Sequence, residues 1–374
     1  MSVDLFHYTR ADLVDVFLSS FSSGITSSKT LFAPRRMGKT EFITQDLAPS
    51  AKKQGYKVIY CNFWGNENNP VLALYGALTI ANSSENLWER TKRLGRNPVN
   101  SIEVSGQIGG VKAGLKATLQ ENKISEDQLQ QLLMSIHELL DRNEKVLFLL
   151  DEVQHLATKT EFAPLVSLLR TVFEGNQHKV KVVYTGSSRE GLQRLFKRRK
   201  SAMFKSSSQV DLPLLDRNFI RHELAAYKKA TGRELSESIA MHTFQKLHYI
   251  PRDFRELLEI CMTQAIEPNE FKALATDFCD GMLQDDGFAP IWESLKPIDR
   301  SILVLFASDS AIALYSEEIK QQLADAIGVD DVPNHTIQNA INRLREKGVL
   351  VQLERGMLEF EDAHFKDWCN LEVR

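Results

Sequence analysis

The chain has 374 residues, 43% hydrophobic and 25% charged, which is ordinary for a folded globular protein of two or three domains. Its formal net charge of −3 gives the chain as a whole no electrostatic attraction to nucleic acid. Its apolar runs are shorter than the roughly 18 residues that span a bilayer, which argues against a membrane-embedded protein.

The cysteines and the first residues indicate the cellular compartment. The four cysteines are scattered, without the C-x-x-C spacing of a metal site. Polar residues among the first ten interrupt the apolar run that a signal peptide requires. We therefore expect a cytoplasmic protein with reduced cysteines and no membrane partner.

Residues 33–40 read A-P-R-R-M-G-K-T, a phosphate-binding loop G-x-x-x-x-G-K-[ST] whose first glycine is replaced by Ala33. The apolar residues before the loop predict a strand, and those after it begin a helix. Backbone N–H groups at such a junction point at phosphates. The residues expected to bind the nucleotide are Pro34, Arg35, Arg36, Met37, Gly38, Lys39 and Thr40.

Two residues of this loop have specific expected roles. Lys39 would reach the β- and γ-phosphates, and the Thr40 hydroxyl would ligate Mg²⁺. Alanine resists a positive φ, so Ala33 is expected in an ordinary backbone region. The alternative interpretation is a chance Gly-Lys-Thr on a surface turn.

The long stretch that follows predicts an insertion over about residues 64–123. Apolar residues alternate on both sides of Gly109 and Gly110, which predicts a β-hairpin at about residues 100–120. This hairpin is either a decorative flap or a contact surface for a subunit or partner. Ser125 and Gln128 then have the spacing of a capping box, so a helix is expected to begin there.

A run of five apolar residues, 146–150, predicts a strand buried on both faces, and it ends in Asp151 and Glu152. Asp151 would hold Mg²⁺, directly or through water. Glu152 would polarise the attacking water as the general base. The alternative is an ordinary strand followed by an acidic turn.

A further strand, residues 179–185, ends in polar residues, of which Ser187 is expected to touch the γ-phosphate or the attacking water. The fold class expected is α/β, with helices on both faces of a parallel sheet. All nucleotide-binding residues would lie at the carboxyl edge of that sheet. The strands expected are 31–32, 57–63, 146–150, 179–185 and 209–212.

The segment from Arg189 to Lys205 contains seven lysines or arginines against Glu190 alone. A charge run of this kind is usually a solvated surface. It could also contact duplex DNA, or supply an arginine finger to ATP in a neighbouring subunit. Arg189, Arg198 and Arg199 are the candidates for that finger.

The rest of the chain predicts two more domains. Residues 213–285 read as helices beginning near Asp216, Ser236 and Pro251. Residues 286–374 predict three helices and a hairpin around Arg355 and Gly356, the order of a winged helix. From residue 290 onwards there are nine Lys or Arg and fifteen Asp or Glu, a net charge of −6. Packing on the ATPase or a partner protein is therefore as well supported as DNA binding.

Together, the P-R-R-x-G-K-T loop, the Asp-Glu strand end, the T-G-S-S strand end and I-P-R at 250–252 resemble bacterial and archaeal P-loop ATPases near the AAA+ and STAND groups. Origin-recognition ATPases are their better-known relatives. The resemblance spans roughly residues 5–260. It implies that residues 8–13 lie beside the adenine, that 213–285 form a lid, and that Arg252 reaches back to the γ-phosphate.

We therefore predict three domains: a P-loop ATPase core at 1–212, a helical lid at 213–285 and a winged helix at 286–374. The cofactors would be ATP and Mg²⁺, and hydrolysis would switch lid and oligomer contacts. The expected use is a DNA-associated task such as replication, transposition or mobile-element defence. The alternatives are a STAND-like signalling ATPase with protein partners, and a nucleotide-gated scaffold that does not hydrolyse.

Overall fold

The computed structural model describes residues 4–82, 124–283, 287–308, 312–354 and 357–371. The β-hairpin expected at about residues 100–120 lies outside them. The chain divides into two compact units. One consists of Thr9–Ala33 with Gly38–Leu212, and the other of Met1–Tyr8, Pro34–Met37 and Pro213–Arg374.

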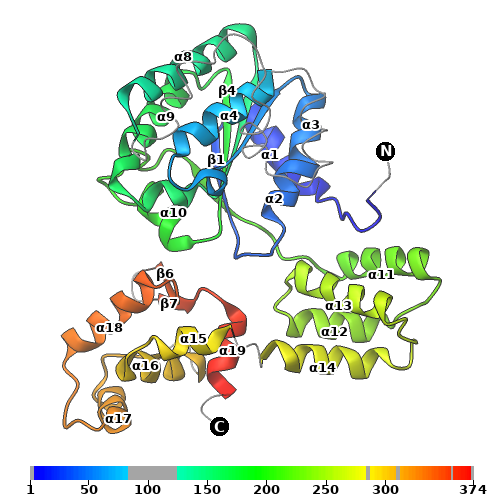
Figure 1. Ribbon diagram of the computed structural model, residues 1–374, viewed down its shortest axis with the longest axis vertical. Helices are drawn as coiled ribbons and strands as arrows, with labels where there is room; N and C mark the ends of the chain where they lie inside the picture. The colour runs from blue at the N-terminus through cyan, green and yellow to red at the C-terminus, as the bar shows by residue number, and fades with distance from the viewer. Residues whose placement is uncertain (1–3, 83–123, 284–286, 309–311, 355–356, 372–374) are drawn as a thin grey trace. The chain divides into compact units, whose positions relative to one another are not determined.

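The first unit contains a parallel five-stranded sheet with flanking helices, as the sequence predicts (Figure 1). The strand order is β2-β3-β4-β1-β5. Every residue of β3 and β4 is buried, which explains their nearly continuous apolar sequences. The strands are β1 (Ser28–Phe32), β2 (Lys57–Asn62), β3 (Val146–Asp151), β4 (Val180–Gly186) and β5 (Ser208–Asp211).

The register aligns the polar strand ends at one edge of the sheet. Asn62 of β2 pairs with Asp151 of β3, and Leu31 of β1 pairs with Thr185 of β4. All four strands run in the same direction, so the loops that follow them leave from the same edge. This edge therefore receives the phosphate loop, the Asp-Glu pair and the polar end of β4.

Apolar faces of the helices fix them to this sheet. On α8, Leu132, Ile136 and Leu139 are fully buried, and Ser125 and Gln128 form the predicted capping box. The helices of this unit are α1 (Ala11–Ser22), α2 (Lys39–Glu41), α3 (Ala48–Lys53), α4 (Pro70–Asn82), α8 (Glu126–Arg142), α9 (Ala163–Gly175) and α10 (Arg189–Phe196).

The helix after the phosphate loop contains a wider turn. A π-helical segment, η1 (Phe42–Leu47), joins α2 to α3. Pro49 follows it at the start of α3, and proline cannot donate the backbone hydrogen bond of a regular helix. A π-turn just before this proline accommodates the missing bond and keeps the helical path continuous.

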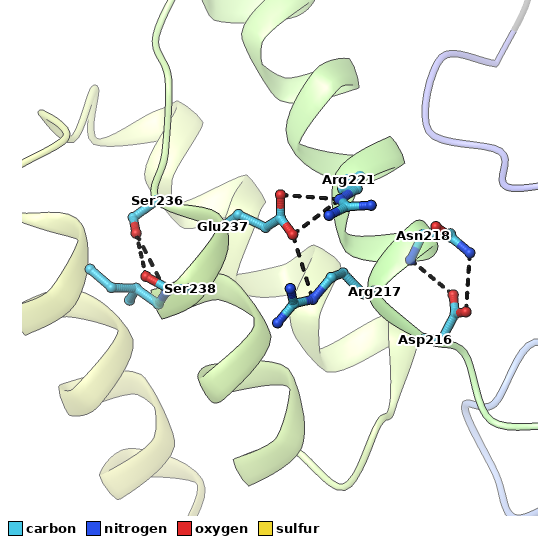
Figure 2. A network of polar contacts seen from close by, with 8 residues as sticks. Asp216, Arg217, Asn218, Arg221, Ser236, Glu237 and Ser238 are labelled. Carbon is cyan, nitrogen blue, oxygen red and sulfur yellow. Dashed lines mark hydrogen bonds and ion pairs between the residues drawn. The ribbon is translucent and has the colours of Figure 1, made fainter.

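The second unit begins with four helices: α11 (Arg217–Thr231), α12 (Glu237–Lys246), α13 (Pro251–Thr263) and α14 (Phe271–Leu283). Asp216 and Ser236 cap α11 and α12 as the sequence predicts. Figure 2 shows how charged side chains join these two helices. Glu237 accepts from Arg221 Nε at 3.1 Å and lies 3.6 Å from Arg217 Nε.

The described part of the C-terminal segment begins with a short helix that the sequence analysis did not predict, and then has three helices and an antiparallel pair of strands in the predicted order. Their apolar faces form one core that includes Ile302, Leu323, Ile337 and Leu344. A last helix, which the sequence analysis did not predict, also packs on this core. These elements are α15 (Phe288–Glu293), α16 (Pro297–Ser308), α17 (Glu317–Ile327), α18 (Asn334–Glu346), β6 (Leu350–Glu354), β7 (Met357–Phe360) and α19 (Ala363–Leu371).

Two polar contacts tie α19 to the four-helix part of its unit. His364 Nε2 lies 3.0 Å from Asp253 Oδ2, and His248 Nε2 lies 2.7 Å from Asp367 Oδ2. Asp253 is fully buried, and it also lies 3.5 Å from Arg36 Nη1, so a buried carboxylate has two cationic or polar partners. Among the helices that the structure describes, none has both the length and the apolar character to cross a bilayer.

Candidate active site

The phosphate loop takes its shape from two left-handed residues. Arg36 has a φ of 65° and Gly38 a φ of 86°. Ala33 has no positive φ, so alanine fits the position where the common motif has glycine. Gly38 then caps α2, and its carbonyl accepts the Phe42 N–H at 2.9 Å. The loop is thus a turn that leads directly into a helix N-terminus.

Lys39 lies inside this loop. Its ammonium group donates to the Ala33 carbonyl oxygen at 2.6 Å, and the residue is only 5% exposed. A buried ammonium group requires anionic or strongly polar partners. Its position at the helix N-terminus therefore suits a bound phosphate chain.

Asp151, at the end of β3, is the centre of a hydrogen-bonded cluster. Its Oδ2 accepts from the Thr40 hydroxyl at 2.7 Å and from the Tyr60 hydroxyl at 3.0 Å, while its Oδ1 accepts from Thr185. The carboxylate is completely buried. Three hydroxyl donors compensate for the removal of its charge from water. The structure thus brings together Thr40 and Asp151, the two residues expected to hold Mg²⁺.

Mg²⁺ fits this pair of residues chemically. The ion prefers oxygen ligands, keeps several waters, and is usually bound by one or two protein groups together with substrate phosphates. A threonine hydroxyl and a carboxylate 2.7 Å apart provide such groups. The phosphates and water would complete the coordination shell.

Tyr60 is a site residue that the sequence analysis missed. Burial, together with the charge of Asp151 and the hydrogen bond to it, raises the pKa of Tyr60 above its ordinary value. The phenol therefore stays protonated and acts as a donor to Asp151. Its only signal in the sequence is its place near the end of a predicted strand. Its contact with Asp151 depends on the order of the strands in the sheet, which the sequence analysis did not predict.

Glu152, the expected general base, has a left-handed backbone with φ 56° and ψ 41°. A non-glycine residue in this region carries strain of about 1–3 kcal/mol. Its N–H donates to the Thr185 hydroxyl at 3.3 Å. Its carboxylate accepts from Ser187 Oγ at 2.8 Å and from the amide of Gln154. Ser187 therefore lies beside the expected base, and its contact with the γ-phosphate or the attacking water stays a prediction.

Arg252 and the arginines of the basic segment are the other residues that the sequence analysis proposed for the site. Arg252 is the second residue of α13, in the other unit, and is exposed. In the basic segment, the Arg189 guanidinium lies 4.0 Å from the ring centroid of Phe32 and 3.5 Å from Asp211. Glu190 lies 3.5 Å from both Arg194 and Arg198. These arginines thus have partners within their own unit.

Comparisons with known proteins agree with this geometry. Residues 37–184 match the KAP family P-loop domain, a range that includes Lys39, Thr40, Asp151 and Glu152. No curated protein matches the chain by sequence. The prediction of a P-loop ATPase relative is confirmed by this match and by the solved structures described next.

Several solved structures, among them the following two, share the fold over nearly the whole chain. The Walker-type ATPase PABY2304 of Pyrococcus abyssi is 14% identical, with a TM-score of 0.60, and the match covers 98% of this chain and 99% of that one. The ADP form of the ORC2 protein of Aeropyrum pernix is also 14% identical, with a TM-score of 0.56 and coverage of 97% and 93%. At such identities the likeness establishes a P-loop NTPase fold of the origin-recognition type, and no more.

Proposed function

We propose that this protein binds ATP with Mg²⁺ and hydrolyses it, using the energy to switch between conformations. The observation that carries the proposal is the convergence of Lys39, Thr40, Asp151 and Glu152 on one edge of the sheet, with Thr40 and Asp151 2.7 Å apart. Adenine is the base proposed, because the ORC2 structures of the same fold hold ADP and ADPNP.

Each residue has a role in the proposed reaction. The loop 34–40 binds the phosphates through its backbone N–H groups, and Lys39 balances their charge. Mg²⁺, held by Thr40 and Asp151, would neutralise charge on the β- and γ-phosphate oxygens. Glu152 accepts a proton from the attacking water. A further cation, either Arg252 or an arginine of the basic segment in a neighbouring subunit, would stabilise the transferring phosphoryl group.

For the biological task we propose a DNA-associated switch in the cytoplasm. Three of the helices of residues 286–374, α16 to α18, followed by the hairpin have the element order of a winged helix. The exposed face of α18 carries amide and imidazole side chains of the kind that read base edges: Asn334, His335, Gln338, Asn339 and Asn342. In the basic segment Lys197, Arg199 and Lys200 are exposed, which suits a phosphate backbone. The four buried, unbridged cysteines suit a reducing compartment.

A second candidate is an ATP-driven switch that acts on a partner protein. One observation favours this candidate. Arg343 of α18 donates to the nearly fully buried Asp299 at 2.6 Å, so the charge of Arg343 is paired within the protein. The C-terminal segment is acidic overall, and this pairing leaves α18 less charge for a phosphate backbone. A protein-binding surface needs no such excess of cations.

Phosphate release from ATP by the purified protein, with and without duplex DNA, tests both candidates. We expect release that DNA stimulates and that Lys39→Ala abolishes, because the variant loses the cation on the phosphates. Lys145→Ala, at an exposed lysine before β3, is the matched control and should keep full activity. Phosphate release that is the same with and without DNA would favour the partner-protein switch. Equal release from the wild type and Lys39→Ala would contradict ATP hydrolysis at this site.

A further inference from the structure

We infer that Gln154 is a positioning residue for the general base: its amide holds one oxygen of Glu152 and leaves the other to accept a proton from water. The inference rests on the proposed ATP hydrolysis. It assigns a function to a residue that belongs neither to the phosphate loop nor to the Asp-Glu pair.

The hydrogen bonds of the Gln154 side chain go to Glu152 and to its neighbour Ser187. Gln154 belongs to a short 3₁₀ helix, η3 (Val153–Ala157), and is only 7% exposed. Its Nε2 donates to Glu152 Oε2 and lies 3.3 Å from Ser187 Oγ. Ser187 Oγ donates to the same Oε2 at 2.8 Å. Two donors on one carboxylate oxygen fix the direction of the side chain and leave Oε1 for the reaction.

Two glycines make room for the Gln154 side chain. A Cβ atom at Gly186 would lie 2.5 Å from Gln154 Oε1, and one at Gly191 would lie 2.5 Å from Gln154 Cβ. Both distances are shorter than any van der Waals contact between such atoms. Neither glycine has a positive φ, so backbone freedom does not explain them. The missing side chains leave a slot between β4 and α10 that Gln154 fills together with Leu192.

The amide has only one sensible orientation in this slot. Its Oε1 is buried and has no hydrogen-bond partner among the described residues. The reversed amide would place that oxygen against the Glu152 carboxylate, where two acceptors repel each other. A buried carbonyl without a partner lowers stability, and an apolar residue such as leucine would avoid this penalty. A glutamine at position 154 is therefore explained by the hydrogen bond that its NH₂ group donates to Glu152.

Glu152 needs such a support for two reasons. Its backbone is left-handed, so its side chain leaves the end of β3 in a direction that the regular strand does not set. The residue is also partly exposed, and a partly exposed glutamate without partners would sample several rotamers. A general base must instead hold one geometry relative to the attacking water.

The test is a comparison of Gln154→Leu with the wild type, measuring steady-state ATP hydrolysis and the Kd for ATP. Leucine has a similar size but no donor. We expect kcat to fall about 10- to 100-fold, as for a small displacement of a reacting group, with an unchanged Kd. Gln131→Leu, at an exposed glutamine on α8, is the matched control and should behave as the wild type.

A further variant separates positioning from a structural role. Gln154→Glu places a second carboxylate beside Glu152. Because adjacent carboxylates resist ionising together, the acid limb of the pH–rate profile should move to higher pH.

The inference is wrong if Gln154→Leu keeps the wild-type kcat, or if it loses ATP binding and kcat together. If neither the wild type nor Gln154→Leu hydrolyses ATP, the proposed function has failed. A double-mutant cycle of Gln154→Leu with Glu152→Ala then tests whether the two side chains interact. Non-additive shifts of the unfolding midpoint would support the pairing of Gln154 with Glu152. Additive shifts would overturn it.

Discussion

Hydroxyl groups from three different strands or helices converge on a single buried carboxylate, Asp151. Thr40, Tyr60 and Thr185 each donate to it. If Mg²⁺ binds as proposed, Thr40 and Asp151 would hold it, and Tyr60 and Thr185 would support the carboxylate of Asp151 through their hydrogen bonds.

Replacement of Tyr60 tests this supporting role. In Tyr60→Phe, Asp151 loses one of its donors and is held less firmly. We expect the Mg²⁺ concentration for half-maximal phosphate release to rise about 10-fold, as is typical when a support of a metal ligand is removed. Tyr75→Phe, at a partly buried tyrosine on α4, is the control. An unchanged Mg²⁺ titration in Tyr60→Phe would show that the hydroxyl does not support the metal site.

At this scale the sequence predicts the residues whose spacing is local, and misses those that depend on strand order. The loop 33–40 and the Asp151–Glu152 pair are contiguous, so their chemistry is visible in the printed sequence. Tyr60 meets Asp151 only because β2 lies next to β3. Gln154 is near Glu152 in sequence, but its function becomes apparent only from the slot left by Gly186 and Gly191.

At the scale of elements, periodicity and capping place the helices and strands well. Each of the five strands predicted for the sheet is present within two or three residues, and Ser125, Asp216 and Ser236 cap helices as expected. The charge available on the surface of α18 could not be predicted in this way. Arg343 reads as part of a locally basic helix, but it pairs with Asp299, which lies 44 residues earlier. A pairing of this range cannot be derived from one sequence.

The contact between α13 and α19 predicts a dependence of stability on pH. Burial alone would lower the pKa of His364, but the hydrogen bond and charge of Asp253, with Asp362 and Asp367 nearby, outweigh it and raise the pKa above the ordinary 6.5. A raised pKa in the folded state adds stability that is complete below pH 6.5 and is lost as the pH rises through the folded-state value.

Denaturant unfolding at a series of pH values measures this effect. We expect the free energy of unfolding of the wild type to fall as the pH rises from about 6 to about 9, and His364→Gln to lack this component because glutamine does not titrate. His242→Gln, at an exposed histidine, should keep the wild-type dependence. If His364→Gln keeps the wild-type pH dependence of the free energy of unfolding, other groups cause that dependence.

At the scale of the whole molecule, the chain joins a nucleotide-binding sheet to a second unit of helices and a hairpin. The loop residues 34–37 group with that second unit, while residues 38–40 group with the sheet. Arg36, at the left-handed turn of the loop, lies 3.5 Å from Asp253, which also pairs with His364. Arg36 and the C-terminal helix, which belong to the same unit, thus share one buried carboxylate.

The most direct test of the central claim, ATP hydrolysis with Glu152 as the base, is the fate of bound ATP in Glu152→Gln. Glutamine keeps the size of the side chain but cannot accept the proton. We therefore expect this variant to bind ATP with Mg²⁺ as tightly as the wild type and to hydrolyse it at least about 100-fold more slowly. Glu144→Gln, at an exposed glutamate before β3, is the control. If Glu152→Gln hydrolyses its bound ATP at the wild-type rate, Glu152 is not the base and the account is contradicted.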